Sequence, residues 1–176
     1  MYSCTVEASA ADEYTSGAWG TLTGDWYAIV ENVDFEFECL RAHFEEEGSD
    51  DDARLATSSF FSVGEKSSRI FDFNATYALR DSGRYKMTYP SDDAAERRSW
   101  ATVFDVGTFE GERWFGWYFC SDMLDITAKG YAAIYKEGSS ASDAFVREAR
   151  DKLKDAGLLR YGDFYRVKQF KCDDAF

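Results

Sequence analysis

Hydrophobic and polar positions alternate with a period of two over most of the chain between Gly24 and Tyr135. A period of two predicts β-strands, and clusters of small and polar residues such as Asp81-Ser82-Gly83 separate the alternating segments. Eight strands joined in sequence order by short turns predict an up-and-down antiparallel barrel, because closing the sheet removes its exposed edges. The predicted strands are Gly24–Asn32, Asp34–Glu46, Arg54–Val63, Ser68–Leu79, Arg84–Tyr89, Arg98–Val106, Arg113–Cys120 and Gly130–Tyr135.

The pattern changes over residues 140–157, where apolar residues recur every four positions from Phe145 on. This period predicts an amphipathic α-helix that packs on the barrel. Ser140 or Ser142 can cap its start, and Gly157 stands where a helix ends.

The length of 176 residues predicts a single domain with a substantial core. Residues 1–23 follow no period, and we interpret them as an arm that lies on the domain. The domain itself then spans residues 24–176, with the barrel in 24–137, the helix in 140–157 and a terminal strand and tail in 158–176. Within the last part, Asp163–Phe170 is the predicted short strand.

Composition narrows the possible functions. The net charge of −13 argues against a nucleic-acid-binding protein, which needs basic side chains, and against electrostatic attachment to anionic lipids. Aromatic residues make up 18% of the chain, enough to line a cavity as well as to fill a core. No apolar run approaches the roughly 20 residues of a membrane span, and the N-terminus lacks a signal-peptide pattern.

Four cysteines are scattered along the chain, at Cys4, Cys39, Cys120 and Cys172. They form no Cys-x-x-Cys motif, so no zinc or other metal site is predicted. An even number of cysteines fits two disulfides and an oxidising compartment, with buried free thiols as the alternative.

The motif Gly24-Asp25-Trp26 opens the first strand. A glycine lets the chain turn close to other backbone, and two residues later a large aromatic side chain can plug the end of a barrel. The indole N–H can meanwhile reach a polar partner.

Four segments and the predicted helix leading to Cys172 occur in a characteristic order: Gly24-Asp25-Trp26-Tyr27, Phe37-Glu38-Cys39, Trp114-Phe115-Gly116-Trp117-Tyr118 and Gly130-Tyr131-Ala132-Ala133-Ile134-Tyr135. In this order they resemble the lipocalins, and among them the lipocalin domain of violaxanthin de-epoxidase. The resemblance spans Gly24 to Cys172 and implies an eight-stranded lipocalin β-barrel with a C-terminal helix, built around an apolar ligand.

The resemblance also suggests that catalysis is lost. In that family an aspartate two residues before a strand tryptophan is the general acid; the matching tryptophan is Trp100, and Arg98 stands at the acid position. An arginine stays protonated and cannot donate that proton. The enzyme's cysteine-rich domain is absent as well, so we expect a non-catalytic protein.

The resemblance implies three sets of site residues. The ligand-binding set is Asn74, Trp100, Trp117, Tyr118 and Tyr135. The barrel plug is Gly24 with Trp26, and Lys136 would supply the cation that contacts the indole. The disulfide that the resemblance implies is Cys39–Cys172, at places where the related domain has cysteines, and Cys4 and Cys120 are then left to pair with each other.

Other residues have alternative interpretations. Glu36 or Glu38 together with Tyr118 could support a de-epoxidase activity, although alternation favours solvent for both glutamates. His43 has no matching base and nucleophile for a triad. Asn74 also begins a formal glycosylation sequon. The acidic run from Glu45 to Asp52 is interpreted as a solvated loop rather than a cation site.

Three functional hypotheses follow. The first is a binding protein for a carotenoid, a chlorophyll-like pigment or a lipid. The second is the de-epoxidase-type enzyme, and the third is an accessory subunit on the lumenal side of a photosystem or its antenna proteins. The resemblance implies the thylakoid lumen of the chloroplast, with secretion as the alternative.

Overall fold

The computed structural model describes residues 22–32, 37–47, 55–64, 67–80, 84–88, 99–121, 130–159 and 163–169. Side chains are described for 22–32, 38–45, 101–119, 130–159 and 163–169. The predicted mainly-β fold with a helix after the eighth strand is confirmed, and each predicted strand matches an observed one. The strands of the barrel are β1 (Gly24–Glu31), β2 (Phe37–Glu47), β3 (Leu55–Gly64), β4 (Ser67–Arg80), β5 (Arg84–Thr88), β6 (Ser99–Phe109), β7 (Glu112–Ser121) and β8 (Tyr131–Lys136).

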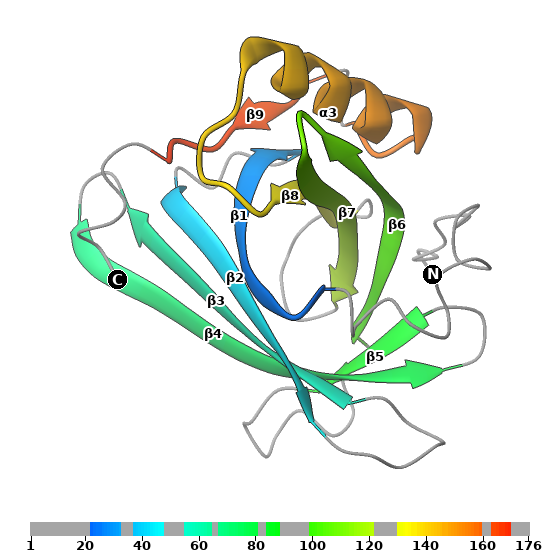
Figure 1. Cartoon of the computed structure of the whole chain (residues 1–176). Helices are drawn as coiled ribbons and strands as arrows, with labels where there is room; N and C mark the ends of the chain where they lie inside the picture. The colour runs from blue at the N-terminus through cyan, green and yellow to red at the C-terminus, as the bar shows by residue number, and fades with distance from the viewer. Residues whose placement is uncertain are drawn as a thin grey trace.

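The strands follow one another around the sheet in chain order, and every neighbouring pair is antiparallel (Figure 1). β8 pairs with β1, and β1 pairs with β2, so the sheet closes on itself. The β1–β2 pairing runs only from Gly24↔Phe44 to Tyr27↔Arg41. Beyond it the two strands no longer pair with each other.

The C-terminal segment lies beside β1 where β2 leaves it. Strand β9 (Tyr165–Arg166) pairs antiparallel with the end of β1, and the Val167 N–H donates to the Ile29 carbonyl at 2.9 Å. On the other side, Lys168 forms a parallel bridge with Glu38 of β2. The predicted terminal strand 163–170 is therefore shorter than expected, and it completes the closure of the barrel.

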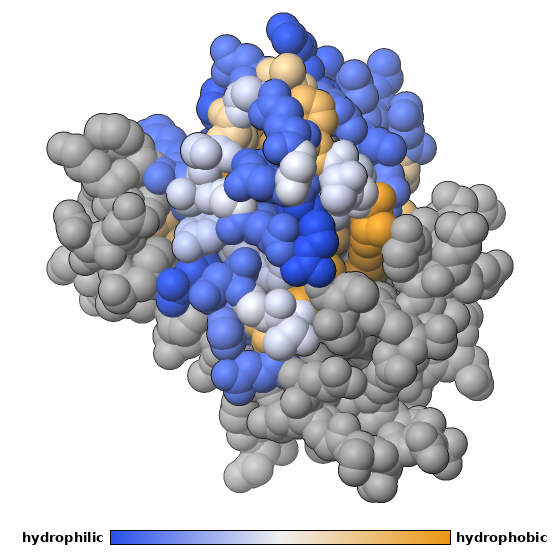
Figure 2. Space-filling view, in the orientation of Figure 1, coloured by the Kyte–Doolittle hydropathy of each residue, from blue (hydrophilic) through white to orange (hydrophobic). Residues whose placement is uncertain are grey.

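Helix α3 (Asp143–Asp155) lies on the outside of the barrel (Figure 1). It is shorter than the predicted 140–157 because Ser142 is the N-cap, and its side chain accepts from the Phe145 N–H at 3.2 Å. Gly157, with φ of +69°, follows the C-terminal end, where the Leu158 N–H donates to the Leu153 carbonyl at 2.9 Å. Figure 2 shows that the outer surface around α3 is mostly hydrophilic.

The described part of the core has two layers. Inside the barrel, side chains from β1, β2, β6, β7 and β8 pack together with Val167. Between the sheet and α3, a second layer holds Ile29, Val30, Phe104, Trp114, Tyr118, Ala132, Ile134, Phe145, Val146, Ala149, Leu153 and Leu158. Asn32 is 1% exposed and bonds to two segments. Its side-chain amide donates to the carbonyl of Leu158, just after α3, at 2.9 Å, and its side-chain oxygen accepts from the Ala132 N–H of β8 at 2.8 Å.

Several predictions fall outside this description. The arm before Leu22, most of the acidic run, Glu36, Arg98, Cys4 and Cys172 lie outside the described residues. Asn74 on β4, Trp100 on β6 and Cys120 on β7 have described backbone only.

Within the described residues, no helix is long and apolar enough to cross a membrane.

Candidate ligand-binding interior

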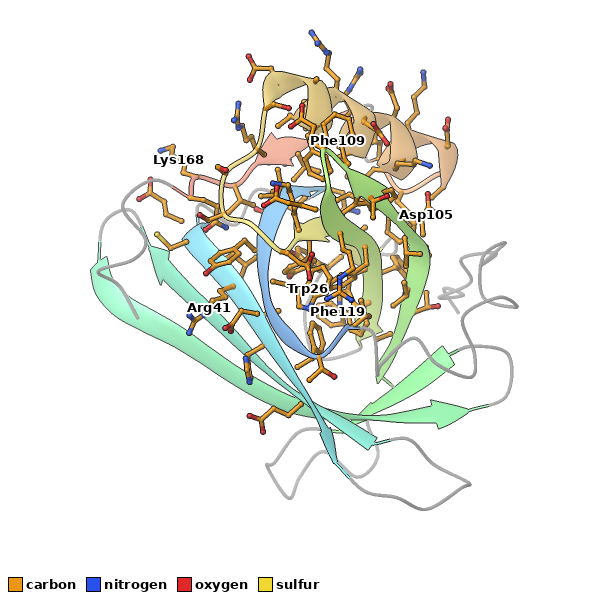
Figure 3. The ribbon with its side chains drawn as sticks, viewed as in Figure 1. Trp26, Arg41, Asp105, Phe109, Phe119 and Lys168 are labelled. Atoms are coloured by element: carbon orange, nitrogen blue, oxygen red, sulfur yellow. The ribbon has the colours of Figure 1, made fainter. Side chains whose placement is uncertain are left out.

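Trp26 lies inside the barrel between β1 and β7 (Figure 3). Its side chain is 1% exposed, its indole N–H donates to the Leu22 carbonyl at 2.6 Å, and its ring meets Phe115 edge-on at 4.9 Å. Gly24 has φ of +113°, a conformation that favours glycine. These contacts have the form expected of the Gly-x-Trp motif, with the indole N–H satisfied by backbone.

The cation over Trp26 is Arg113, and the expected contact from Lys136 is not made. The Arg113 guanidinium lies 5.3 Å from the indole centroid. Glu137 holds it there by accepting from Arg113 Nε at 2.8 Å, and this hydrogen bond lowers the pKa of Glu137 and raises that of Arg113.

Lys136 lies on the opposite side of the sheet. It is 3% exposed, donates to the Ser140 carbonyl at 2.7 Å, pairs with Glu112, and its ammonium lies 5.8 Å from the Phe145 ring centroid. The physical reason is alternation: Tyr135 faces the interior, so its neighbour faces the helix. The barrel-plug prediction is corrected to Gly24, Trp26 and Arg113.

Aromatic rings from four strands fill the described part of the interior. Phe115 and Tyr135 stack with 5.3 Å between centroids and 8° between planes. Phe44 contacts Phe115 at 5.9 Å and Trp117 at 5.8 Å. Two of the predicted ligand-binding residues, Trp117 and Tyr135, are thus brought together in one cluster, and both are 1% exposed.

Tyr118 lies elsewhere. It belongs to the layer beneath α3, while its neighbour Trp117 faces the interior. Consecutive residues of a regular strand point to opposite faces, so Trp117 and Tyr118 could not both line the interior. We therefore take Tyr118 out of the candidate binding set, whereas Asn74 and Trp100 remain predictions because their side chains are not described.

A polar cluster lies in the same interior, and no pattern in the sequence predicted it. Glu31 is 3% exposed and accepts from the Tyr131 hydroxyl at 3.2 Å. The cause is an irregularity in β1: Ala28 pairs with Tyr135, but Val30 pairs with Ile134, so one extra residue separates the two positions. Strict alternation from Trp26 and Ala28 would place residue 30 inside and residue 31 outside. The bulge reverses this and turns the Glu31 carboxyl inward.

The two interior tyrosines stay protonated well above neutral pH. Burial raises the pKa of Tyr131 well above its ordinary value of 10, and Tyr135 and Glu31 act in the same direction. Burial also raises the pKa of Tyr135; the neighbouring Tyr131 hydroxyl partly offsets this, and the Glu31 charge adds to it. Both hydroxyls can therefore donate hydrogen bonds.

Cys39 is disulfide-bonded, and its partner lies among residues whose side chains are not described. It has φ of +57° at an irregularity of β2, where its N–H donates to the Lys168 carbonyl at 2.8 Å. Nearby, the Gln169 amide donates to the carbonyls of Ala28 and Leu40 at 2.8 and 2.9 Å. These bonds bring the segment leading to Cys172 against the start of β2.

The other two candidates with described side chains, Glu38 and His43, lie at the surface. Glu38 pairs with Lys168 at 3.1 Å, near the labelled Lys168 in Figure 3, and is not brought to Tyr118. His43 bonds to Asp25 and Glu45 at 2.9 and 3.1 Å. Within the described ranges, no three His, Cys, Asp or Glu side chains are placed to hold a metal ion.

Comparison by sequence finds no matching family model and no matching curated protein. Comparison of structures finds lipocalin-fold proteins. The allergen Per a 4 from cockroaches is 16% identical with a TM-score of 0.67, covering 99% of both chains. Lobster apocrustacyanin A1 is 12% identical with a TM-score of 0.65, covering 95% of this chain and 88% of its own.

A third similar structure is the siderocalin Ex-FABP, at 14% identity and a TM-score of 0.56, covering 84% of this chain and 94% of its own. At these identities the likeness concerns the fold. The chain has the lipocalin fold, as its closed sheet, Gly-x-Trp motif and external helix indicate.

Proposed function

We propose that this protein binds an apolar small molecule inside its barrel. The observation that carries the proposal is the interior itself, where Trp26, Phe44, Phe115, Trp117 and Tyr135 present aromatic rings from β1, β2, β7 and β8. Ligand sites in proteins are lined mainly by hydrophobic and aromatic side chains with few polar groups. The similar siderocalin is described as working through dual ligand specificities, which fits a ligand-binding use of this fold.

Extraction of the natively purified protein tests the proposal. The solvent extract is analysed by absorbance and mass spectrometry, and the stripped protein is titrated with a carotenoid, a chlorophyll and a fatty acid while tryptophan fluorescence is followed. Trp26 and Trp117 lie in the interior cluster, so we expect a bound ligand to quench the emission. Protein that carries nothing and quenches with none of the three probes would contradict the proposal.

The compartment is part of the same proposal. The Cys39 disulfide supports an oxidising compartment, and both secretion and the thylakoid lumen meet that condition. An accessory role beside a photosystem or antenna protein rests only on the resemblance to the violaxanthin de-epoxidase lipocalin domain. Co-migration with photosynthetic complexes in a native gel would support that role, and migration as a free species of about 20 kDa would argue against it.

The de-epoxidase alternative has less support from geometry. Tyr118 belongs to the layer beneath α3 and Glu38 pairs with Lys168 at the surface, so the residues proposed for it are apart. Incubation with violaxanthin, ascorbate and a galactolipid at acid pH tests this alternative, and de-epoxidised product above the buffer control would restore it.

A further inference from the structure

Strands β1 and β2 separate after four paired residues, and part of the C-terminal segment lies between them from there on. This part comprises residues 165–169, which we call the strap. Figure 1 shows β9 and the residues that follow it beside the end of β1 and the start of β2. At this place the barrel wall is therefore made by the strap, and not by a direct pairing of β1 with β2.

Gln169 lies at the point where the two strands separate. Its side-chain nitrogen donates to the Ala28 carbonyl of β1 at 2.8 Å and to the Leu40 carbonyl of β2 at 2.9 Å. Ala28 and Leu40 are the first residues beyond the last β1–β2 pair, Tyr27↔Arg41. One amide group thus takes the place of the backbone hydrogen bonds that would otherwise join the two strands here.

The strap also completes the inner surface of the barrel. Val167 is 5% exposed and belongs to the interior cluster that contains Trp26, Ala28 and Leu40. Its N–H donates to the Ile29 carbonyl at 2.9 Å. Displacement of the strap would therefore uncover the interior from the side, between β1 and β2, and not from an end of the barrel.

Little apolar surface holds the strap in place. Val167 is the one buried side chain among residues 163–169, whereas all six residues of β8 are buried. The regular pairing of β9 with β1 covers two residues, Tyr165 and Arg166. Segments with few buried apolar contacts open locally at a lower free energy than core strands do. We therefore expect the strap to open more readily than β8.

We propose that the strap is a side gate through which an apolar ligand enters and leaves the barrel between β1 and β2. This inference rests on the proposed binding function. The gate opens when Gln169 releases the two carbonyls and Val167 leaves the interior. A bridge between Cys39 and Cys172, as predicted, would keep the open strap attached to β2.

A gate has a kinetic signature that a ligand contact lacks. The strap closes the empty and the occupied barrel alike, so a change that weakens it favours the open state equally in both. Ligand association and ligand dissociation should then speed up by the same factor, and the affinity should stay the same. Loss of a ligand contact mainly speeds dissociation and weakens the affinity.

Gln169→Leu tests the gate, because leucine is of similar size and cannot donate to either carbonyl. The stripped full-length protein is mixed rapidly with whichever of the carotenoid, the chlorophyll and the fatty acid binds most tightly, and tryptophan quenching is followed in time. We expect both rate constants to rise about tenfold, which corresponds to about 1.4 kcal/mol, while Kd changes less than about twofold.

The other outcomes separate the gate from the binding function. Unchanged rate constants, or a change in only one of them, would overturn the gate and leave the proposed function standing. Failure of the wild-type protein to bind any of the three probes would overturn both.

Asn32→Leu is the matched control. Asn32 also joins two segments through its side-chain amide, but its partners, Leu158 and Ala132, belong neither to the strap nor to β2. The substitution should lower the melting temperature and leave both rate constants unchanged. If it speeds binding as much as Gln169→Leu does, general loss of stability is the cause and the gate is overturned.

Hydrogen exchange of the stripped protein detects the opening without a ligand. The Val167 N–H is bonded to Ile29, and the Cys39 N–H is bonded to Lys168, so an open strap exposes both amides to exchange. Both should exchange faster than the amides of β8, and faster still in Gln169→Leu. Exchange at Val167 as slow as in β8 would show that the strap opens only when the whole protein unfolds, and the gate would be overturned.

Discussion

His43 shows what a single residue on the outer face can contribute. It faces Asp25 across β1 and β2, and its two ring nitrogens bond to Asp25 and Glu45. Partial burial lowers its pKa, but the hydrogen bonds and charges of the two carboxylates together outweigh burial and raise the pKa above 6.5. The imidazolium therefore stabilises the folded state more than the neutral ring does.

The sign of the pH dependence follows from that raised pKa. The stabilisation is fully present below the unfolded-state pKa of 6.5 and is lost as the pH rises through the higher folded-state pKa. We expect His43→Asn to lower the melting temperature more at about pH 5 than at about pH 9. The ring is 36% exposed, so the effect should be small and should shrink in high salt. A pH-independent difference between variant and wild type would contradict this prediction.

Gly116 is a position where a single residue determines how its neighbours pack. It pairs with Asp105 across β7 and β6, next to an irregularity at Phe104. A Cβ on Gly116 would fall onto the Phe104 ring, 2.6 Å from Cε2, and Phe104 is buried between the sheet and α3. The glycine therefore makes room for the aromatic side chain.

Gly116→Ala should destabilise the protein by about 1 to 3 kcal/mol, the usual cost of overpacking a well-filled core. Urea unfolding measures the loss. Adding Phe104→Leu should recover part of it, because the two side chains compete for one space. A double variant whose loss equals the sum of the two single losses would show that the contact is not the cause.

At the scale of the element, α3 is held on the barrel by its buried face and by polar contacts at both ends. Phe145 packs on Phe109 of β6 at 5.3 Å, and Lys152 pairs with Asp105 at 3.0 Å and lies 5.5 Å from the Trp114 ring centroid. At the N-terminal end, Arg166 pairs with Asp143 at 3.0 Å. The helix thus links β6 and β7 to the terminal segment.

The start of α3 depends on Ser142. Ser142→Ala removes the acceptor for the Phe145 N–H and should destabilise the protein by about 1 kcal/mol. Ser140→Ala is the matched control, because Ser140 precedes the cap and contributes its backbone carbonyl to Lys136. Chemical denaturation compares the two variants. A loss at Ser140 as large as that at Ser142 would contradict the assignment of the cap.

At the scale of the whole molecule, closure of the barrel depends on residues far apart in the chain. β1 pairs with β2 over four residues, and the segment around Val167 then lies between β1 and the start of β2. The Cys39 backbone N–H donates to the carbonyl of Lys168, and Lys168 lies four positions before Cys172 in the chain. This placement supports Cys172 as the disulfide partner of Cys39, which stays a prediction.

Peptide mapping without reduction tests the pairing, and a Cys39–Cys172 peptide is the expected result. A bridge across a loop of about 130 residues should stabilise the protein by roughly 4 to 5 kcal/mol in the chain-entropy model, less any strain. Cys39→Ser should therefore lower the urea midpoint and increase hydrogen exchange in residues 163–169. A peptide joining Cys39 to Cys4 or Cys120 would refute the pairing.

The sequence by itself determined the elements. Period-two alternation located the strands, period-four recurrence located α3, and Gly24 with Trp26 marked the start of the barrel, because these signals depend on neighbours a few residues apart. The tertiary structure decided which side of the sheet each side chain faces. The irregularity after Ala28 turned Glu31 inward, alternation placed Tyr118 and Lys136 on the helix side, and Arg113 took the place over Trp26. These outcomes depend on pairing between distant strands, and a shift of one residue in that pairing reverses the face of every residue that follows.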